Sequence, residues 1–160
     1  MTGDSVARKI GRSLIRNQLT LSVCESCTGG MLGTLITSIP GSSEYFVGGI
    51  LAYSDAIKKR VVGVKARTIR QFGAVSTQVA REMALAVKRR MMSHIGIGIT
   101  GIAGPSGGSK EKPVGLVYIG LAMKRRIVVR KFVFKGGREA IRRSACKQAL
   151  MLLHEVLHET

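Results

Sequence analysis

Ser26 lies in the segment Glu25–Gly30, which reads Glu-Ser-Cys-Thr-Gly-Gly, and it is the first candidate for chemistry. It falls between an expected strand over 19–25 and an expected helix over 31–39. The first N–H groups of a helix have no intrahelical partner and favour negative charge. A serine placed there is a candidate nucleophile, with neighbouring N–H groups as an oxyanion hole. The alternative is structural, with Ser26 or Thr28 only capping the helix.

Cys27 is the rival nucleophile at the same turn. A thiolate at a helix N-terminus has a lowered pKa. Most free cysteines, however, are small buried residues without chemistry. No histidine stands near it in the sequence to act as its base, so Ser26 is the preferred nucleophile.

Lys58 is the candidate general base, five residues after Tyr53 at the end of a second expected strand over 45–53. A lysine accepts a proton only when it is held neutral, by burial or by a cationic neighbour. Lys59 and Arg60 are such neighbours in the sequence. The alternative is a solvated basic cluster without chemistry.

The stretch from Thr100 to Gly115, Thr-Gly-Ile-Ala-Gly-Pro-Ser-Gly-Gly-Ser-Lys-Glu-Lys-Pro-Val-Gly, is expected to be a loop up to Pro113. Successive N–H groups in a glycine-rich loop can bind an anion. The loop is neither a P-loop nor a Rossmann dinucleotide fingerprint, because it lacks both spacings. The alternative is a flexible surface loop.

Metal and cofactor chemistry find no support in the sequence. There is no His-Glu-x-x-His, no paired Cys-x-x-Cys and no His/Asp/Glu cluster with metal spacing. His154 and His158, four residues apart, fit a solvated terminal helix better than a metal site. With three histidines, two of them on that helix, a Ser-His-Asp triad is poorly supported. We expect no metal and no cofactor.

The charge of the chain is lopsided. Lys and Arg number 26 against 9 Asp and Glu, a formal net charge of +17, which attracts anions. The basic residues are dispersed along the chain, as on a solvated surface rather than a nucleic-acid interface. The start of the chain has no signal-peptide pattern, no apolar run approaches the ~18 residues of a membrane span, and the three cysteines are expected to be reduced. We expect a cytoplasmic protein without a membrane partner.

The pattern of elements predicts an α/β fold over one domain, residues 1–160. A basic amphipathic helix begins the chain, and Ser76 or Thr77 starts a helix that runs to about Met92. Ile95, Ile97 and Ile99 alternate with glycines, which predicts a strand that another element approaches closely. Two strands over 114–122 and 126–134 form an antiparallel pair before a last helix that follows Gly136-Gly137. The sum is a three-layer α/β/α sandwich on a mixed, partly parallel sheet, with the ligand crevice at the carboxyl ends of the strands.

Six short motifs occur in one order along the chain: ESCTGG at 25–30, PGSS at 40–43, YSDAIK at 53–58, GAVS at 73–76, TGIAGP at 100–105 and KPVG at 112–115. Together they resemble the CinA C-terminal domain family, whose stand-alone members are nicotinamide-nucleotide amidases. The resemblance extends from about Ile10 to Leu153.

The resemblance implies hydrolysis of nicotinamide mononucleotide to nicotinate mononucleotide and ammonia, without metal or cofactor. It implies Ser26 as nucleophile and Lys58 as base, with Tyr53 and Thr100 beside them. Arg142 resembles a family arginine that meets the phosphate, with Arg138 and Arg143 as alternatives. The expected substrate-binding residues are Thr28, Gly29, Gly30, Gly101, Gly104, Gly107, Gly108 and Arg142.

Three other hypotheses stay open beside the amidase. The chain could be a DNA-associated accessory protein, although it has no helix-turn-helix, zinc finger or basic motif interleaved with aromatic residues. It could be an idle nucleotide-binding module, or an amidase whose nucleophile is Cys27. The expected partner is a small nucleotide substrate rather than nucleic acid, and a homo-oligomer is left open.

Overall fold

The computed structural model describes residues 3–159, which build one five-stranded mixed sheet covered by helices on both faces. The helices are α1 (Gly3–Arg16), α2 (Met31–Thr37), α3 (Asp55–Ile57), α4 (Ala66–Phe72), α5 (Thr77–Arg90) and α6 (Arg138–His158). The strands are β1 (Leu21–Glu25), β2 (Phe46–Leu51), β3 (Ile95–Gly101), β4 (Leu116–Met123) and β5 (Arg126–Val133). Two short turns of helix, η1 (Ser42–Glu44) and η2 (Lys58–Val62), complete the elements.

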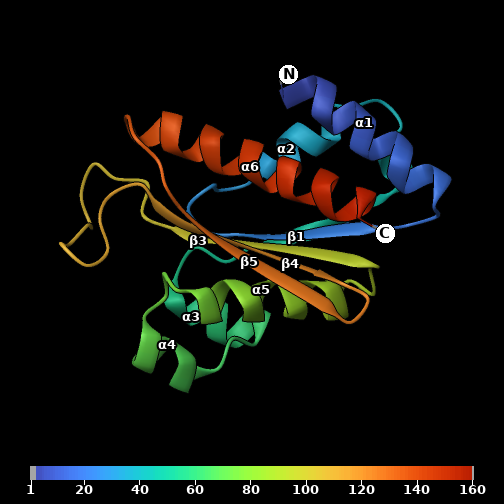
Figure 1. The fold of residues 1–160 in the computed structure, drawn as a ribbon. Helices are drawn as coiled ribbons and strands as arrows, with labels where there is room; N and C mark the ends of the chain where they lie inside the picture. Colours follow the sequence, from blue (N-terminus) through green and yellow to red (C-terminus); the bar gives the residue numbers. More distant parts are fainter. Residues whose placement is uncertain (1–2, 160) are drawn as a thin grey trace.

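The strands lie in the order β2-β1-β3-β4-β5. β2, β1 and β3 are parallel, and β4 and β5 extend the sheet antiparallel. Helices α1, α2 and α6 cover one face of the sheet, and α3, α4 and α5 cover the other (Figure 1). The predicted three-layer α/β/α sandwich on a mixed, partly parallel sheet is confirmed.

Glycines on one face of β3 bring α5 close to the sheet. Ile95, Ile97 and Ile99 are buried in the core with α1, α2 and α6. The glycines between them face α5, and a Cβ at Gly98 would lie 2.6 Å from the Ala84 nitrogen and 2.7 Å from the Ala80 oxygen. The alternation of isoleucine and glycine therefore gives β3 one face of large side chains that pack in the core and one face that α5 approaches closely, as predicted.

Several predicted boundaries differ by two residues from the observed ones, and the end of β3 is the one that concerns the site. Thr100 and Gly101 were expected to begin the glycine-rich loop, but they belong to β3 and pair with Tyr118 and Val117 of β4. The antiparallel neighbour extends the strand, and sequence pattern alone does not reveal that pairing. Thr100 thereby gains a fixed place at the end of the sheet.

The parallel register brings the carboxyl ends of three strands together. Glu25, the last residue of β1, pairs with Leu51 of β2 on one side and with Ile99 of β3 on the other. The loops that follow these strands therefore meet at one edge of the sheet. Among residues 3–159, no helix is long and apolar enough to cross a membrane.

The close approach of α5 makes a stability prediction. Gly98→Ser should lower the free energy of unfolding by about 1–3 kcal/mol, because its Cβ would meet main-chain atoms of α5 that cannot move aside cheaply. Urea unfolding followed by circular dichroism measures the change.

Gly137→Ser is the matched control, because a Cβ there has no neighbour within 4 Å. Gly137 is the N-cap of α6, where serine is also a preferred residue, so the change should stay within a few tenths of a kcal/mol. Equal effects at the two positions would contradict the packing argument.

Candidate active site

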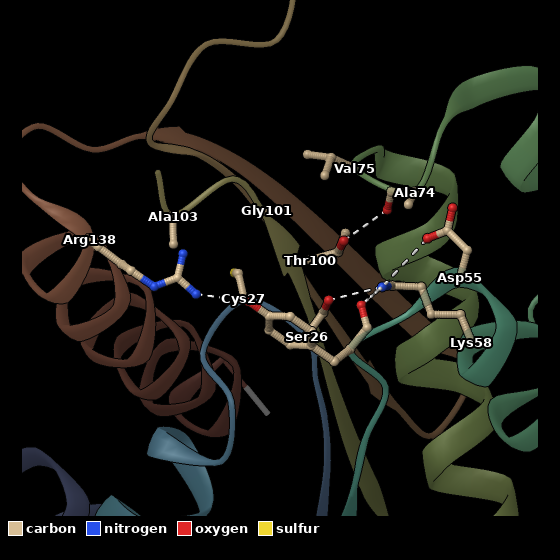
Figure 2. Close-up of a pocket in the computed structure, with 11 residues that line it drawn as sticks. Ser26, Cys27, Asp55, Lys58, Ala74, Val75, Thr100, Gly101, Ala103 and Arg138 are labelled. Carbon is tan, nitrogen blue, oxygen red and sulfur yellow. Dashed lines mark hydrogen bonds and ion pairs between the residues drawn. The ribbon is translucent and has the colours of Figure 1, made fainter. Parts of the chain in front are cut away.

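Ser26 begins the turn between β1 and α2. Its main-chain N–H donates to the Ile99 oxygen over 3.0 Å, so the turn starts from a point fixed on the neighbouring strand β3. The Ser26 oxygen in turn accepts from the Gly29 N–H over 3.0 Å. The residue is buried at 7% exposure, and its hydroxyl faces the cavity at this edge of the sheet (Figure 2).

Glu25 occupies the N-terminus of α2. Its carboxylate, buried at 1% exposure, accepts hydrogen bonds from the main-chain N–H groups of Gly30, Leu32 and Gly33, at 3.1, 3.1 and 2.8 Å. These are the N–H groups that a helix start leaves without an intrahelical partner. Glu25 therefore caps α2 from the preceding strand and forces the residues between into a tight turn.

The expectation that the start of α2 supplies the oxyanion hole is wrong in this respect. The N–H groups of the first turn are already used by Glu25, whose negative charge also offsets the helix dipole. The N–H groups of Cys27 and Thr28, within the turn itself, donate to no oxygen in the described part of the chain. They are the N–H groups of the turn that follow the nucleophile candidate directly in the sequence and do not hydrogen-bond Glu25.

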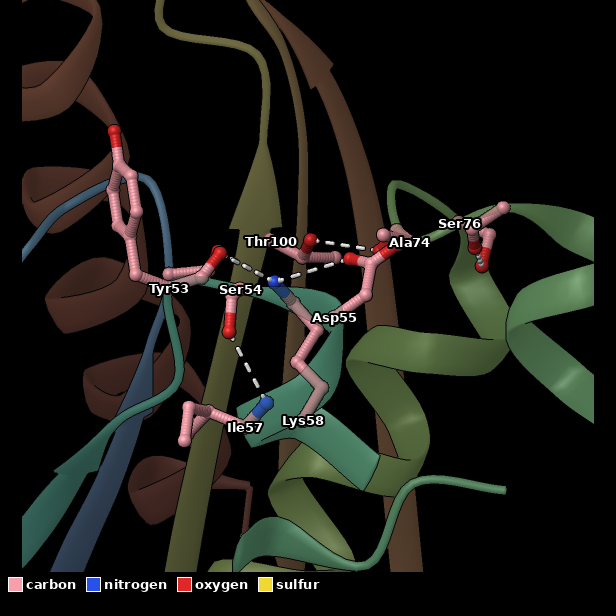
Figure 3. A network of polar contacts seen from close by, with 10 residues as sticks. Tyr53, Ser54, Asp55, Ile57, Lys58, Ala74, Ser76 and Thr100 are labelled. Carbon is pink, nitrogen blue, oxygen red and sulfur yellow. Dashed lines mark hydrogen bonds and ion pairs between the residues drawn. The ribbon is translucent and has the colours of Figure 1, made fainter. Parts of the chain in front are cut away.

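Lys58 brings its amine to that hydroxyl from the other face of the sheet. Its Nζ lies 2.9 Å from Ser26 Oγ (Figure 2) and donates to the Tyr53 oxygen over 3.1 Å (Figure 3). The short helix that positions it is N-capped by Ser54, whose hydroxyl accepts from the Ile57 N–H over 3.2 Å. Asp55, one turn earlier, has a carboxylate oxygen 4.0 Å from the Lys58 amine.

The environment favours the neutral form of Lys58. The side chain is buried at 2% exposure, and burial lowers the pKa of the amine below its ordinary value. Asp55 opposes this shift, because a nearby carboxylate stabilises the ammonium form. A neutral amine at 2.9 Å from a serine hydroxyl is placed to accept the hydroxyl proton.

Thr100 closes the cavity on the side of the loop 73–76. Its hydroxyl donates to the Ala74 oxygen over 2.8 Å. Lys112 ties the same loop down, since its Nζ donates to the Phe72 oxygen over 2.6 Å and to the Val75 oxygen over 2.8 Å. The motifs at 73–76 and 100–105 therefore contribute to one wall of the cavity, and Lys112 of the third motif holds the first of them in place from outside the lining.

Arg138, at the start of α6, stands on the opposite side of the cavity (Figure 2). Its guanidinium donates to the Gly104 oxygen over 2.7 Å and to the Tyr53 hydroxyl over 2.8 Å. Arg142, one turn further along α6, donates instead to the Thr28 oxygen over 2.8 Å and does not line the cavity. Arg138 is thus the arginine that faces the site.

The cavity has a volume of about 240 Å³. It brings together five of the residues expected from the sequence, namely Ser26, Lys58, Tyr53, Thr100 and Gly101. Thr28, Gly29, Gly30, Gly104, Gly107, Gly108 and Arg142 are not part of its lining. The cavity is lined by Ser26, Cys27, Tyr53, Asp55, Lys58, Ala74, Val75, Thr100, Gly101, Ala103 and Arg138.

The glycines outside the lining shape the backbone. A Cβ at Gly104 would lie 2.5 Å from a Val114 side-chain carbon, and one at Gly108 would lie 2.7 Å from the Val114 nitrogen. These glycines let the loop fold against its own C-terminal end. Gly29 adopts a φ of +57° in the turn, and its missing Cβ leaves room for the Arg142 guanidinium.

The cysteines are poor nucleophiles. Burial raises the pKa of the Cys27 thiol to about 11 and that of Cys24 to about 12, and it raises the pKa of Cys146 as well. The charge of Glu25 pushes all three thiols in the same direction. Cys27 lines the cavity but is held as the thiol, which favours Ser26 as the nucleophile.

Metal binding gains no support from side-chain clustering. Across residues 3–159, no group of three or more His, Cys, Asp or Glu side chains could hold a metal ion. The His154 and His158 rings lie 4.1 Å apart on α6, and burial lowers the pKa of His154.

Sequence reasoning assigned no role to Glu25 or Asp55. Both stand inside motifs noted above, and a signal for each was available. Asp55 is three residues before Lys58, a spacing that puts two side chains on one face of a helical turn. Glu25 directly precedes a turn with two glycines, but only the structure shows that its side chain reverses to cap α2.

The sequence of the chain is similar to known proteins over most of its length. The family described as "CinA C-terminal domain" matches residues 3–157. A CinA-like protein of Thermosynechococcus vestitus is 47% identical over 157 residues, covering 96% of this chain and 38% of its own length. A CinA-like protein of Gloeothece citriformis is 56% identical over 119 residues, covering 74% of this chain and 28% of its own. The chain thus spans about a third of the length of these curated relatives.

Solved structures match over nearly the whole chain. The competence/damage inducible protein CihA from Agrobacterium tumefaciens superposes with a TM-score of 0.94 at 35% identity, covering 98% of this chain and 95% of that one. A CinA superfamily protein from Klebsiella pneumoniae gives a TM-score of 0.96 at 29% identity, with full coverage of both chains.

Fold and sequence therefore define an α/β protein of the CinA superfamily. More narrowly, the chain belongs to the CinA C-terminal domain family.

The state of the thiols can be tested directly. At pH 7.5 a thiol with a pKa of about 11 is ionised in fewer than about one molecule in a thousand. The folded protein should therefore show no fast reaction with an aromatic disulfide reagent, and the unfolded protein should release colour from three thiols. Labelling of Cys27 within minutes in the folded protein would reopen the cysteine hypothesis.

Proposed function

We propose that this protein hydrolyses the carboxamide of nicotinamide mononucleotide to nicotinate mononucleotide and ammonia, with Ser26 as nucleophile and Lys58 as base. The observation that carries the proposal is the buried contact of 2.9 Å between Lys58 Nζ and Ser26 Oγ in the cavity at the carboxyl edge of the sheet. A hydroxyl becomes a useful nucleophile when an adjacent base removes its proton. A lysine held neutral by burial is such a base.

The chemistry runs through an acyl-enzyme. Lys58 takes the proton of Ser26 as Oγ bonds to the carboxamide carbon, and the carbonyl electron pair moves onto oxygen. When the tetrahedral intermediate collapses, the C–N bond breaks and Lys58 returns the proton to nitrogen, so ammonia leaves. Water then attacks the ester as Lys58 takes one of its protons, and the C–O bond to Ser26 breaks as Lys58 returns that proton to Oγ, which releases the carboxylic acid. The sum consumes one water and regenerates both side chains.

The oxyanion of each intermediate needs fixed donors. The N–H groups of Cys27 and Thr28 lie in the turn that carries the nucleophile, and no oxygen in the described residues accepts from them. A pair of preorganised N–H donors of this kind is typically worth 10²-fold or more in rate. The Glu25 cap holds the backbone of this turn in place without using these two groups.

The anionic end of the substrate fits the side of the cavity that Arg138 forms. An arginine recognises phosphate through several N–H groups at once, and Arg138 is already oriented by the Gly104 oxygen and the Tyr53 hydroxyl. The cavity of about 240 Å³ is smaller than a typical small-molecule pocket. It suits the carboxamide and its ring, with the ribose phosphate extending outward past Tyr53, which is 61% exposed.

The decisive measurement is ammonia release from nicotinamide mononucleotide by the purified protein in the presence of a chelator. We expect release that survives chelation, falls at least about 10³-fold in Ser26→Ala and about 10²- to 10⁴-fold in Lys58→Ala. Lys59→Ala is the matched control for the lysine, because its side chain is exposed next to Lys58.

Two outcomes would contradict this assignment. Activity that survives Ser26→Ala and disappears in Cys27→Ala would transfer the nucleophile to the thiol. No release by intact, folded protein would remove the amidase function and leave the nucleotide- or DNA-binding hypothesis, which binding titrations against salt concentration would then test.

The dependence of rate on pH tests Lys58 as the base. The reaction needs the neutral amine, so kcat/KM should rise with pH through the pKa of Lys58. Asp55 raises that pKa, so Asp55→Asn should lower it and shift the acidic limb of the profile to lower pH. Glu44→Gln removes an equal charge from an exposed residue that does not line the cavity and should leave the limb in place. A shift to higher pH in Asp55→Asn would contradict the assignment.

A further inference from the structure

Thr100 presents only hydrogen-bond acceptors to the cavity. Its side chain lines the cavity and the residue is buried at 1% exposure. A hydroxyl carries one hydrogen, and a carbonyl oxygen can only accept. Because Thr100 Oγ1 lies 2.8 Å from the Ala74 oxygen, the hydrogen of the hydroxyl is committed to that bond. The lone pairs of Oγ1 are what remains for a ligand.

The groups around Thr100 share this polarity. Asp55 lines the same cavity, and its carboxylate accepts hydrogen bonds without donating them. The Ala74 and Tyr53 oxygens already accept from Thr100 and Lys58. Arg138, which only donates, stands on the opposite side (Figure 2). The cavity thus has an acceptor side next to Lys58 and a donor side at Arg138.

We infer that Thr100 determines specificity for a primary carboxamide by accepting a hydrogen bond from the amide nitrogen of the substrate. The inference rests on the proposed amidase function and adds the direction in which the amide lies. The NH₂ group turns toward Thr100 and Lys58, and the anionic part of the substrate turns toward Arg138. The leaving nitrogen then lies next to the amine that returns its proton.

The same contact separates substrate from product. An amide nitrogen carries hydrogens that Thr100 can accept, whereas a carboxylate oxygen or an ester oxygen carries none. A site whose buried acceptor expects an N–H discriminates strongly against an analogue without one, because the acceptor is then left unpaired. Hydrolysis removes this hydrogen bond and favours release of the acid.

The test compares nicotinamide mononucleotide with the methyl ester of nicotinate mononucleotide, two substrates that yield the same acyl-enzyme. Thr100→Val keeps the shape of the side chain and removes the acceptor. We expect kcat/KM for the amide to fall about 10- to 100-fold relative to kcat/KM for the ester in this variant. Thr100→Ser keeps the hydroxyl and should keep the amide-to-ester ratio of the original protein within a few fold.

A purely structural role predicts a different result. If Thr100 only holds the loop 73–76 through the Ala74 oxygen, its loss lowers both activities by the same factor. Equal losses, or no change in the amide rate, overturn the inference. Ester hydrolysis by the variant shows that the site is folded, and Thr100→Ala replaces Thr100→Val if the valine variant does not fold.

The inference and the proposed function fail in different ways. Ammonia release by the original protein decides whether there is an amidase. The amide-to-ester ratio in the variants decides whether Thr100 selects the amide.

Discussion

The contact between Lys58 Nζ and Ser26 Oγ is the interaction on which the rest of the site depends. A buried ammonium is costly, so burial at 2% exposure lowers the pKa of Lys58 and makes hydrogen-bond partners for its amine necessary. Ser26 and the Tyr53 oxygen are these partners. Both lie just beyond the carboxyl ends of β1 and β2, which are adjacent and parallel. The parallel pair β1–β2 is thus the structural reason why a serine and a lysine separated by 32 positions meet.

The N–H groups at the start of α2 could either activate a nucleophile in the preceding turn or hydrogen-bond the Glu25 carboxylate, and they bond Glu25. Free N–H groups there would activate any nucleophile in the turn, including the Cys27 thiol. The Glu25 carboxylate takes these N–H groups, and its charge helps to keep the thiols protonated. In the proposed mechanism, activation of the nucleophile is then left to Lys58, which contacts Ser26. One buried carboxylate therefore favours oxygen over sulfur as the nucleophile.

The elements of the fold could be predicted because their patterns are local. The Ile-Gly alternation of β3 and the N-cap Ser76 of α5 appear in the structure as expected. What failed depends on tertiary pairing. The end of β3 is determined by its pairing with the antiparallel strand β4. The N–H groups at the start of α2 donate to the side chain of Glu25, the last residue of β1. Arg138 and Arg142 are the same residue type one helical turn apart, so the sequence does not distinguish them. The packing of α6 against the turn after β1 does: Arg138 faces the cavity, and Arg142 donates to the Thr28 oxygen.

The net charge of +17 and the cavity act at different ranges. A dispersed positive field attracts any anion and does not distinguish a nucleotide from a nucleic acid. Selection requires donors and acceptors at fixed places, and within the cavity they are segregated. Arg138 is oriented by the Gly104 oxygen and the Tyr53 hydroxyl, whereas Thr100 has committed its hydrogen to Ala74. A ligand that is anionic at one end and carries N–H groups at the other satisfies both sides at once, and this is the orientation inferred for the proposed amide substrate. The polarity of the cavity, more than the charge of the surface, argues for a small amide substrate.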